Sequence, residues 1–221
     1  MKRRLSNEPI SKIINKKSFW KDNFYVNEFV LDPRPETEIV IEESLKIFNN
    51  KNTNLKILDI GTGSGSIAIS LAREFENADI LAIDISEEAI KVAKKNIIDK
   101  KLDNRIKLKK TTIDSINQNF DLIVSNPPYL TSSQIKNLPQ DIKKYEPRIA
   151  LKGGNDGLDV IKKVIYKSKS ILKKKGMLAL EIGNGQHLKV IKILKSNNFR
   201  KVLLVKDYQD NVRCIISVLE N

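Results

Sequence analysis

The sequence of 221 residues has little of what several kinds of functional site need. It contains one cysteine, Cys214, and one histidine, His187. A single cysteine excludes an internal disulfide framework and a zinc site built from cysteines. A single histidine excludes a multi-histidine metal centre and disfavours Ser-His-Asp or Cys-His catalysis. The composition therefore predicts a protein that works without a metal ion.

Long apolar runs are also missing. No stretch approaches the ~20 consecutive apolar residues that a membrane-spanning helix needs. The basic residues 1–17 contain no apolar core of a secretory signal. Wholesale disorder is excluded, because 40% of the residues are hydrophobic and 30% are charged. We therefore expect a globular, cytoplasmic protein with no membrane partner.

Acidic residues are few relative to basic ones. Lys and Arg number 40 against 27 Asp and Glu, which gives a net charge of +13. A field of this sign favours anionic partners, so proximity to the ribosome or RNA is one interpretation. The other is that abundant lysine, spread through the whole chain, reflects a general compositional habit. The charge alone does not choose between them.

Short apolar runs alternate with helical patterns along the chain. Strands are expected at residues 55–60, 79–84, 105–109, 120–125, 177–182, 201–205 and 212–219. Helices are expected at residues 36–49, 66–75, 86–99, 158–174 and 186–196. This alternation is typical of an α/β fold with a doubly wound, mostly parallel sheet. The last two strands have no helix between them and should pair antiparallel at an edge.

The two ends of this pattern suggest how the chain is organised. Residues 1–31 form a basic lead-in, and its aromatic residues 19–26 predict a short β-hairpin. Residues 32–221 form one α/β domain without internal repeats. Within it, residues 130–157 are rich in turn formers, and such a long irregular stretch in a compact domain is usually functional. The lysine run at residues 173–175 is expected to be a solvated helix end.

A glycine-rich turn joins the first predicted strand of the domain to the next helix. Gly61, Gly63 and Gly65 allow a tight turn and let a ligand touch the main chain. Asp59 directly precedes the glycines and could meet an ammonium group. Asp84 closes the following strand, where a carboxylate can accept hydrogen bonds from both hydroxyls of a ribose. The segment therefore predicts a cofactor cradle.

The identity of the cofactor follows from what stands beside the glycines. Residues 63–68 satisfy the loose G-x-G-x-x-A pattern of dinucleotide binding, whereas no Gly-Lys-Ser/Thr follows to make a P-loop. The carboxylate of Asp59 would repel a pyrophosphate. These features favour S-adenosylmethionine, with S-adenosylhomocysteine as its product.

The segment N-P-P-Y follows the fourth predicted strand of the domain. A planar –NH2 group is a poor nucleophile, and two acceptors on its N–H bonds would orient it and stabilise the charge that develops on methylation. The side-chain oxygen of Asn126 and the carbonyl of Pro127 are the natural acceptors. Pro128 helps to stiffen the bend, and Tyr129 can lay its ring against a flat substrate group. The segment predicts an amide or amine aligner.

Taken together, these motifs resemble the HemK-type glutamine N5-methyltransferase family along the whole chain. Residues 34–38 resemble its R-P-E-T-E segment, and residues 59–65 and 126–129 its cofactor and N-P-P-Y motifs. Residues 146–158 resemble its E-P-x-x-A-L…G-G-x-D-G-L stretch, and residues 180–186 its L-E-I-G-x-x-Q segment. The resemblance implies a class I methyltransferase fold with a seven-stranded mixed sheet, its last strand antiparallel, and helices on both faces.

The resemblance also implies an activity and a set of site residues. The activity is methyl transfer to the glutamine of the Gly-Gly-Gln motif of peptide-chain release factors. Asn126, Pro127 and Tyr129 are expected to be catalytic, and Pro128 and Arg34 are expected to join them in binding substrate. The expected cofactor-binding residues are Asp59, Gly61, Thr62, Gly63, Gly65, Asp84, Ile85, Thr112, Asn126, Glu36 and Thr37.

The sequence departs from the family pattern in three places. Residues 1–31 look like the connector that follows a small N-terminal helical domain, which would assist docking of the release factor. Thr111-Thr112-Ile113-Asp114 stands where an acid usually faces the adenine, so Thr112 or Asp114 is expected to serve there. The turn over residues 207–213 lacks an expected glycine.

Two other functions fit part of the pattern. An N-methyltransferase acting on an exocyclic amine of RNA or DNA would also use N-P-P-Y, and the +13 charge favours it. A non-catalytic module that binds S-adenosylmethionine would keep the cradle without turnover.

Overall fold

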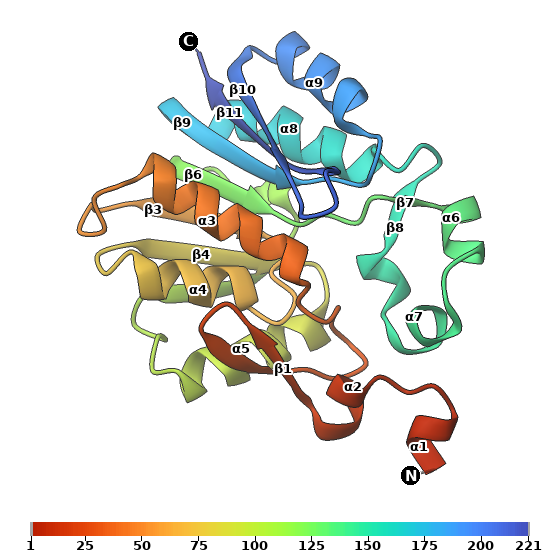
Figure 1. Ribbon diagram of the computed structural model, residues 1–221. Coiled ribbons are helices and arrows are strands. Elements are labelled where there is room, and N and C mark those ends of the chain that lie inside the picture. The colour runs from red at the N-terminus through yellow and green to blue at the C-terminus, as the bar shows by residue number, and fades with distance from the viewer. Residues whose placement is uncertain (1, 221) are drawn as a thin grey trace.

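A seven-stranded sheet forms the centre of the computed structural model, which describes residues 2–220 (Figure 1). Residues 1 and 221, the outer ends of the two predicted regions, lie outside the described residues. The strand order is β10-β11-β9-β6-β3-β4-β5. The strands are β3 (Lys56–Ile60), β4 (Asp79–Asp84), β5 (Ile106–Lys110), β6 (Phe120–Ser125), β9 (Leu172–Glu181), β10 (Phe199–Lys206) and β11 (Val212–Leu219).

The pairing confirms the predicted mixed sheet. β5, β4, β3, β6 and β9 pair in parallel, whereas β11 pairs antiparallel with both β9 and β10. β11 is thus inserted between β9 and the edge strand β10. Since the parallel strands all run in one direction, their carboxyl ends meet along one edge of the sheet, which is where ligands bind in open α/β sheets.

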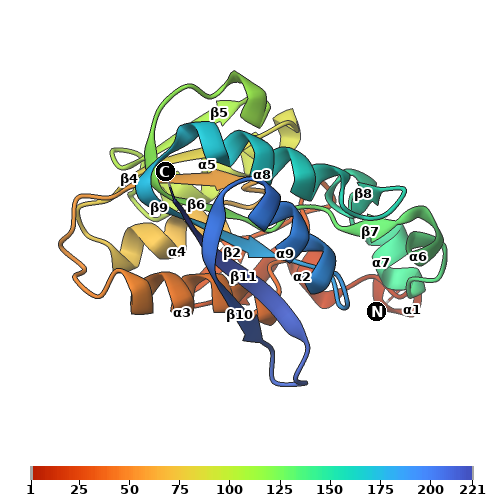
Figure 2. The ribbon, with the colours of Figure 1, turned by 90° about the horizontal axis from the view of Figure 1, so that it is seen from above.

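Helices cover both faces of the sheet (Figure 2). The five long helices are α3 (Glu38–Ile47), α4 (Ser66–Glu74), α5 (Glu87–Asp99), α8 (Asp159–Ile171) and α9 (His187–Ser196). Successive strand residues point to opposite faces, so Leu122 and Val124 pack with α3, α4 and α5, while Ile123 packs with α8 and α9. Both faces of the sheet are covered by packed apolar side chains, which accounts for the continuous apolar runs of the central strands.

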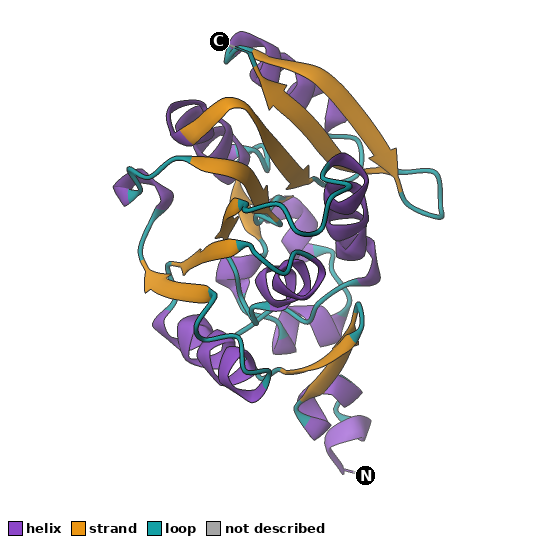
Figure 3. Cartoon of the chain, turned by 90° about the vertical axis from the view of Figure 1, so that its left-hand side faces the viewer, coloured by secondary structure: helices purple, strands orange, loops and turns teal. Residues whose placement is uncertain are grey.

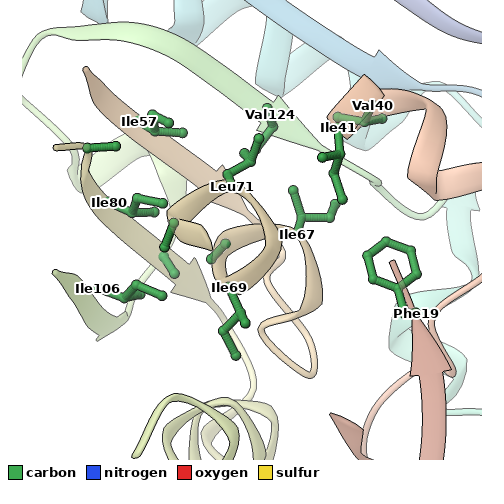
Figure 4. Close-up of a cluster of buried hydrophobic side chains, with 14 of the residues drawn as sticks. Phe19, Val40, Ile41, Ile57, Ile67, Ile69, Leu71, Ile80, Ile106 and Val124 are labelled. Carbon is green, nitrogen blue, oxygen red and sulfur yellow. The ribbon is translucent and has the colours of Figure 1, made fainter. Parts of the chain in front are cut away.

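The core beside α3 and α4 also includes the lead-in. Figure 4 shows side chains from four strands and two helices converging with Phe19 of the hairpin: Ile57, Ile80, Ile106 and Val124 on strands, and Val40, Ile41, Ile67, Ile69 and Leu71 on helices. At about 25 cal/mol per Å² of apolar area removed from water, such burial is the main stabilising contribution. The hairpin is therefore part of the same hydrophobic core.

The lead-in has the predicted hairpin preceded by two short helices (Figure 3). These elements are α1 (Lys2–Leu5), α2 (Ile10–Ile14), β1 (Lys16–Phe19) and β2 (Asp22–Tyr25). The side chain of Asn96 on α5 fastens the hairpin. Its Oδ1 accepts from Tyr25 N at 2.7 Å, and its Nδ2 donates to Tyr25 O at 3.0 Å and to Ser64 O at 2.8 Å. One buried amide thus joins the lead-in to the glycine turn.

The segment over residues 130–157 is more regular than expected. It contains β7 (Leu130–Thr131), α6 (Ser132–Lys136), α7 (Gln140–Tyr145), a 3-10 turn η3 (Arg148–Ala150) and β8 (Lys152–Gly154). Thr131 and Gln134 form a capping box that starts α6. β7 and β8 pair in parallel, so the segment folds back to lie beside its own start. Two further 3-10 turns are η1 (Pro35–Thr37) and η2 (Ile113–Ser115).

The predicted helix end at residues 173–175 is wrong. α8 ends at Ile171, and the three lysines belong to the start of β9. Leu172 pairs with Phe120 on β6, and a register shift then brings Met177 opposite Leu122. Lys175 takes φ 62° within this irregular stretch. The lysines are exposed as expected, but they lie on a strand.

No helix among residues 2–220 is both long and apolar enough to cross a membrane.

Candidate active site

A cavity of about 370 Å³ lies at the carboxyl ends of β3 and β4. Its volume falls within the range usual for small-molecule sites. The lining includes the glycine turn, the end of β4, residues 111–114, Asn126, and residues 29–34, which join the lead-in to the segment before α3. We call it the first cavity.

The glycine turn at its base is held by the neighbouring strand. Gly61 N and Thr62 N both donate to Ile83 O, at 2.9 and 3.0 Å. Gly61 and Gly63 have φ values of 72° and 55°, which side chains with a Cβ rarely adopt. A Cβ added to Gly61 would meet no atom within 4 Å. The turn therefore presents bare main chain to open space, as a cradle for a ligand must.

Asp59 lies directly behind this turn and is completely buried. Its Oδ2 accepts from Thr62 Oγ1 at 2.7 Å and from Ala68 N at 3.2 Å. Its Oδ1 has no hydrogen-bond partner among the described residues. Burial raises the pKa of this carboxyl to about 7. Asp59 is not in the cavity wall, so the structure places it where it holds the turn and has one acceptor to spare.

Asp84 is in the cavity wall at the end of β4. Its Oδ2 accepts from Gly63 N at 3.0 Å, and its Oδ1 accepts from Ser86 N at 2.9 Å. Burial raises its pKa, against the lowering effect of these hydrogen bonds. The main chain of Ile85 also lowers this pKa through a hydrogen bond. A carboxylate has about four acceptor positions, so acceptor capacity remains for a ligand hydroxyl.

The other predicted cofactor-binding residues fall in three places. Thr37, Ile85 and Thr112 line the first cavity, as does Asp114, the alternative to Thr112. Gly65 is buried where α4 begins and lies outside the wall. Glu36 lines a second cavity instead of the first.

The second cavity, of about 290 Å³, adjoins the first. Its wall combines apolar side chains, among them Leu138, Ile142 and Leu151, with the charged groups of Glu36, Glu181 and Arg213. A further set of residues lines both cavities and so forms the partition between them: Leu31, Arg34, Asn126 and Ala150. The asparagine of N-P-P-Y thus stands where the two spaces meet.

The rest of the N-P-P-Y bend surrounds this partition. Asn126 Nδ2 donates to Thr37 Oγ1 at 3.0 Å, and the hydroxyl of Tyr129 donates to Glu181 Oε1 at 3.3 Å. Burial is the main cause of the raised pKa of Tyr129, with the nearby Glu181 adding to it. Pro128 lines the first cavity and Tyr129 the second, while Pro127 is buried and lines neither.

The bend is packed tightly from behind by the G-G-x-D-G-L stretch. A Cβ added to Gly153 would lie 2.6 Å from Tyr129 Cα and 2.7 Å from Pro128 O. Gln186 Nε2 donates to Tyr129 O at 3.0 Å, and Gln186 Oε1 accepts from Gly183 N at 2.9 Å. The N-P-P-Y main chain is therefore fixed by contacts from two later segments.

Arg34, predicted to bind substrate, is held by a buried ionic cluster. Its Nη2 lies 2.9 Å from Glu146 Oε1. Lys12 Nζ, from α2, lies 2.8 Å from Asp32 Oδ1 and 3.3 Å from Glu146 Oε2. Burial raises the pKa of Glu146, and Lys12 counters that effect. The cluster ties the lead-in and residue 146 to the segment that carries Arg34.

Three residues of the site received no role from the sequence. Glu181 and Glu146 stand in recognised motifs, and Arg213 lies at the end of the chain. Glu181 ends β9, and ligands bind at the carboxyl ends of parallel strands, so its position in a predicted strand was the signal that could have identified it. Arg213 reaches the second cavity through the pairing of β11 with β9, which sequence alone does not specify. In the turn before it, Asp210 takes the positive φ of 66° where a glycine was expected.

The first cavity fits S-adenosylmethionine by its own donors and acceptors. Main-chain groups are exposed at the glycine turn and acceptor capacity remains on Asp84, while Asp59, with one unpartnered buried oxygen, lies behind the turn and outside the wall. The adjoining Ile85 and Ile113 give the wall an apolar part. A ligand with a cationic end, a ribose and an aromatic base matches this set.

Comparisons with known proteins agree with the fold. A family model described as a methyltransferase domain matches residues 51–205. The fold is similar to the N-terminal domain of human METTL16 in complex with SAH, with a TM-score of 0.63 and 18% identity, over 87% of this chain and 73% of that one. The predicted class I methyltransferase fold is confirmed.

Curated relatives are similar over nearly the whole chain. Identity is 39% to the release factor glutamine methyltransferase of Buchnera aphidicola subsp. Baizongia pistaciae, over 98% of this chain and 77% of that protein. It is 41% to the protein of that name from Flavobacterium psychrophilum, over 94% of this chain and 74% of that protein. With the cradle, the N-P-P-Y bend and the two joined cavities, this similarity confirms the predicted resemblance: the chain belongs to the release factor glutamine methyltransferase family.

Proposed function

We propose that this chain transfers a methyl group from S-adenosylmethionine to the side-chain amide nitrogen of the glutamine in the Gly-Gly-Gln motif of a peptide-chain release factor. The observation that carries the proposal is the position of Asn126. It lies in the wall shared by a cavity suited to the cofactor and a cavity suited to a side chain entering from a protein substrate.

The bound cofactor supplies a methyl group on a positively charged sulfur, which is reactive toward a well-placed nitrogen. The residues of this chain supply position. Asp84 accepts from the ribose hydroxyls, while Gly61, Thr62 and Gly63 offer main chain and Asp59 holds their turn in shape. Such positioning accounts for a large part of the catalysis of a displacement reaction.

The N-P-P-Y bend orients the substrate amide. Asn126 Oδ1, at the partition, accepts from one N–H bond, and the carbonyl of Pro127, a residue that lines neither cavity, is the proposed second acceptor; Tyr129 and Pro128 flank the flat group. The two acceptors also stabilise positive charge that develops on the nitrogen. The methylated nitrogen then loses a proton readily, so no strong general base is required. This agrees with a chain that has one histidine.

The remaining assignments are proposals of the same kind. Arg34 binds substrate from the partition, and Glu36 does so from the second cavity or reaches the cofactor from there. Residues 1–31 form a lead-in to a methyltransferase domain at 32–221, and Lys12 and Asn96 join the two. The enzyme acts in the cytoplasm, beside ribosomes and RNA, where release factors work and where a net charge of +13 favours anionic surroundings.

One observation favours a second candidate, which is methylation of an exocyclic amine on RNA or DNA. The net charge of +13 suits an anionic substrate, although Arg34 and Arg213 in the second cavity are each paired with a carboxylate. A base amine is flat, as an amide is, and would meet the same two acceptors. The candidates differ in what surrounds the reacting group and therefore in substrate.

A labelled-methyl transfer assay separates these candidates. The chain is incubated with labelled S-adenosylmethionine and, in parallel, a release factor, the same factor with alanine in place of its Gly-Gly-Gln glutamine, ribosomal RNA and DNA. We expect label only in the unmodified release factor. Label in nucleic acid, with activity falling steeply as salt rises, would support the second candidate. Cofactor binding without transfer to any substrate would identify a non-catalytic module.

A further inference from the structure

A chain of hydrogen bonds runs from the partition between the cavities into the protein interior. Asn126 Nδ2 donates to Thr37 Oγ1 at 3.0 Å, and the Thr37 hydroxyl donates to Glu181 Oε2 at 2.5 Å. Thr37 and Glu181 are each 3% exposed. Thr37 borders the first cavity and Glu181 the second, but with so little exposed surface most of their donors and acceptors are matched within the chain.

The direction of these bonds is set at the buried end. An ionised carboxylate only accepts hydrogen bonds, and a hydroxyl has a single hydrogen to donate. With Glu181 ionised, the Thr37 hydrogen points to Glu181, so Thr37 Oγ1 can only accept from Asn126. Asn126 must then turn its –NH2 toward Thr37 and its Oδ1 away from it.

We propose that Glu181 is a positioning residue, which acts through Thr37 to make Asn126 present its oxygen, and not its –NH2, to the substrate amide. This inference rests on the proposed function. The substrate amide offers two N–H donors, so the reversed orientation of Asn126 would place donor against donor. With a protonated Glu181, Thr37 can accept from the carboxyl and donate to Asn126 Oδ1, which permits that reversal.

The surroundings of Glu181 bear on when it is ionised. Burial raises its pKa to about 7. The Thr37 and Tyr129 hydroxyls and the charge of Arg213 on β11 lower it, and Glu36 raises it. Cys214, opposite Glu181 in the β9–β11 pairing, is a buried thiol whose pKa is raised mainly by burial, and it stays neutral. We call the hydrogen-bond chain Glu181–Thr37–Asn126 the relay. Protonation of Glu181 as the pH falls through about 7 therefore disables the relay, and methyl transfer is lost at acidic pH.

The test compares pH profiles of kcat/KM for methyl transfer to the release factor. We expect a wild-type acid limb near pH 7. In Glu181→Gln the limb should disappear and kcat/KM at pH 8 should fall about 10- to 100-fold, as when one preorganised group loses its orientation. Thr37→Val should behave similarly, whereas Thr37→Ser, which keeps the hydroxyl, should restore the limb and most of the loss. An unaltered acid limb in Glu181→Gln overturns the proposal.

Two controls exclude trivial causes. Glu43 is a carboxylate on α3 that is 6% exposed and lies outside the relay, so Glu43→Gln tests whether removing any buried charge changes the profile. Asp59 also has a pKa of about 7. Loss of the acid limb in Asp59→Asn, with its retention in Glu181→Gln, would assign the limb to Asp59 and reject the relay.

A second measurement needs no turnover. The side-chain amide signal of Asn126 in the 15N-labelled chain, assigned with Asn126→Ala, should shift with pH through about 7 in the wild type and stay constant in Glu181→Gln. A signal that does not follow Glu181 refutes the relay even in an active enzyme. A signal that does follow it, in a chain that transfers no methyl to the release factor, upholds the relay and rejects the proposed function.

Discussion

The glycine turn at residues 61–65 and the N-P-P-Y bend at residues 126–129 both follow a parallel strand, yet they are held in different ways. The turn is fixed by elements that lie close to it along the chain. Asp59 accepts from Thr62, and Ile83 and Asp84 at the end of β4 accept from main-chain N–H groups of the turn. Asn96 on α5 donates to Ser64, 32 residues away. The bend depends on distant segments: Thr37 lies 89 residues before Asn126, and Gln186 lies 57 residues after Tyr129.

This difference separates binding from alignment. The cradle is held by β3, α4, β4 and α5, which follow one another along the chain. The bend is held by the segment before α3, the turn at residue 153 and the end of β9, which come from three separate parts of the chain. We therefore expect changes at the bend to reduce turnover with little effect on cofactor affinity, and changes at the cradle to do the reverse.

The largest effect is expected for Asn126→Ala, the change that tests the bend most directly. Loss of the acceptor that orients the substrate amide should lower kcat about 10³-fold, the upper range for one preorganised group. The cofactor dissociation constant, measured by calorimetry, should change less than about threefold. Asn119→Ala, at an exposed loop position before β6, serves as the matched control. Weaker cofactor binding with normal turnover at saturation would reverse the assigned roles.

A smaller effect is expected for Gly153→Ala, which acts on the bend from behind. The added methyl would overlap Tyr129 Cα and Pro128 O, so the bend must move to admit it. Overpacking of this kind costs about 1–3 kcal/mol of folding free energy, and the displaced bend should lower kcat about 10- to 100-fold.

Urea unfolding and steady-state kinetics measure the two consequences separately. Asn155→Ala, exposed in the same stretch, should leave the unfolding midpoint in place. An unchanged kcat in Gly153→Ala would mean that the bend tolerates displacement and that its shape is not what aligns the substrate.

The same contrast explains what could be predicted from the sequence. Gly61 to Gly65, with Asp59 before them and Asp84 one strand later, form a pattern readable along the chain, and the alternation of apolar runs with helical patterns predicted every strand of the central sheet. The N-P-P-Y segment could be predicted to be an aligner because the chemistry proposed for it lies within four consecutive residues.

The contacts that surround the N-P-P-Y bend could not be predicted from the sequence. Glu181 and Arg213 reach the second cavity through strand pairing, and Lys12 reaches Glu146 through the docking of the lead-in. None of these contacts leaves a spacing pattern, since each joins segments whose separation in sequence is arbitrary. The lysines of residues 173–175 show the same limit, because only pairing with β6 reveals that they begin a strand.

The smallest effect on kcat is expected for Asp84→Ala, which tests the cradle. Asp84 offers its free acceptor positions to ligand hydroxyls while its two oxygens also accept from Gly63 N and Ser86 N. Loss of one hydrogen bond to a charged group costs about 1.5–3 kcal/mol, so cofactor affinity should fall by at least roughly 10- to 100-fold. At saturating cofactor, kcat should stay within about threefold of the wild type, because the bend is untouched.

Asp79→Ala provides the matched control for this experiment. Asp79 is an exposed aspartate at the other end of the same strand, β4, where it pairs with Lys56 of β3. It shares the chemistry and the strand but not the cavity, so its loss should leave cofactor affinity unchanged. If instead Asp84→Ala lowered kcat at saturating cofactor as strongly as Gly153→Ala does, cradle and bend would work as one unit. The separation of binding from alignment would then be wrong, because a change at Asp84 on β4 would have reached Asn126 after β6, on the other side of β3, in the wall of the same cavity.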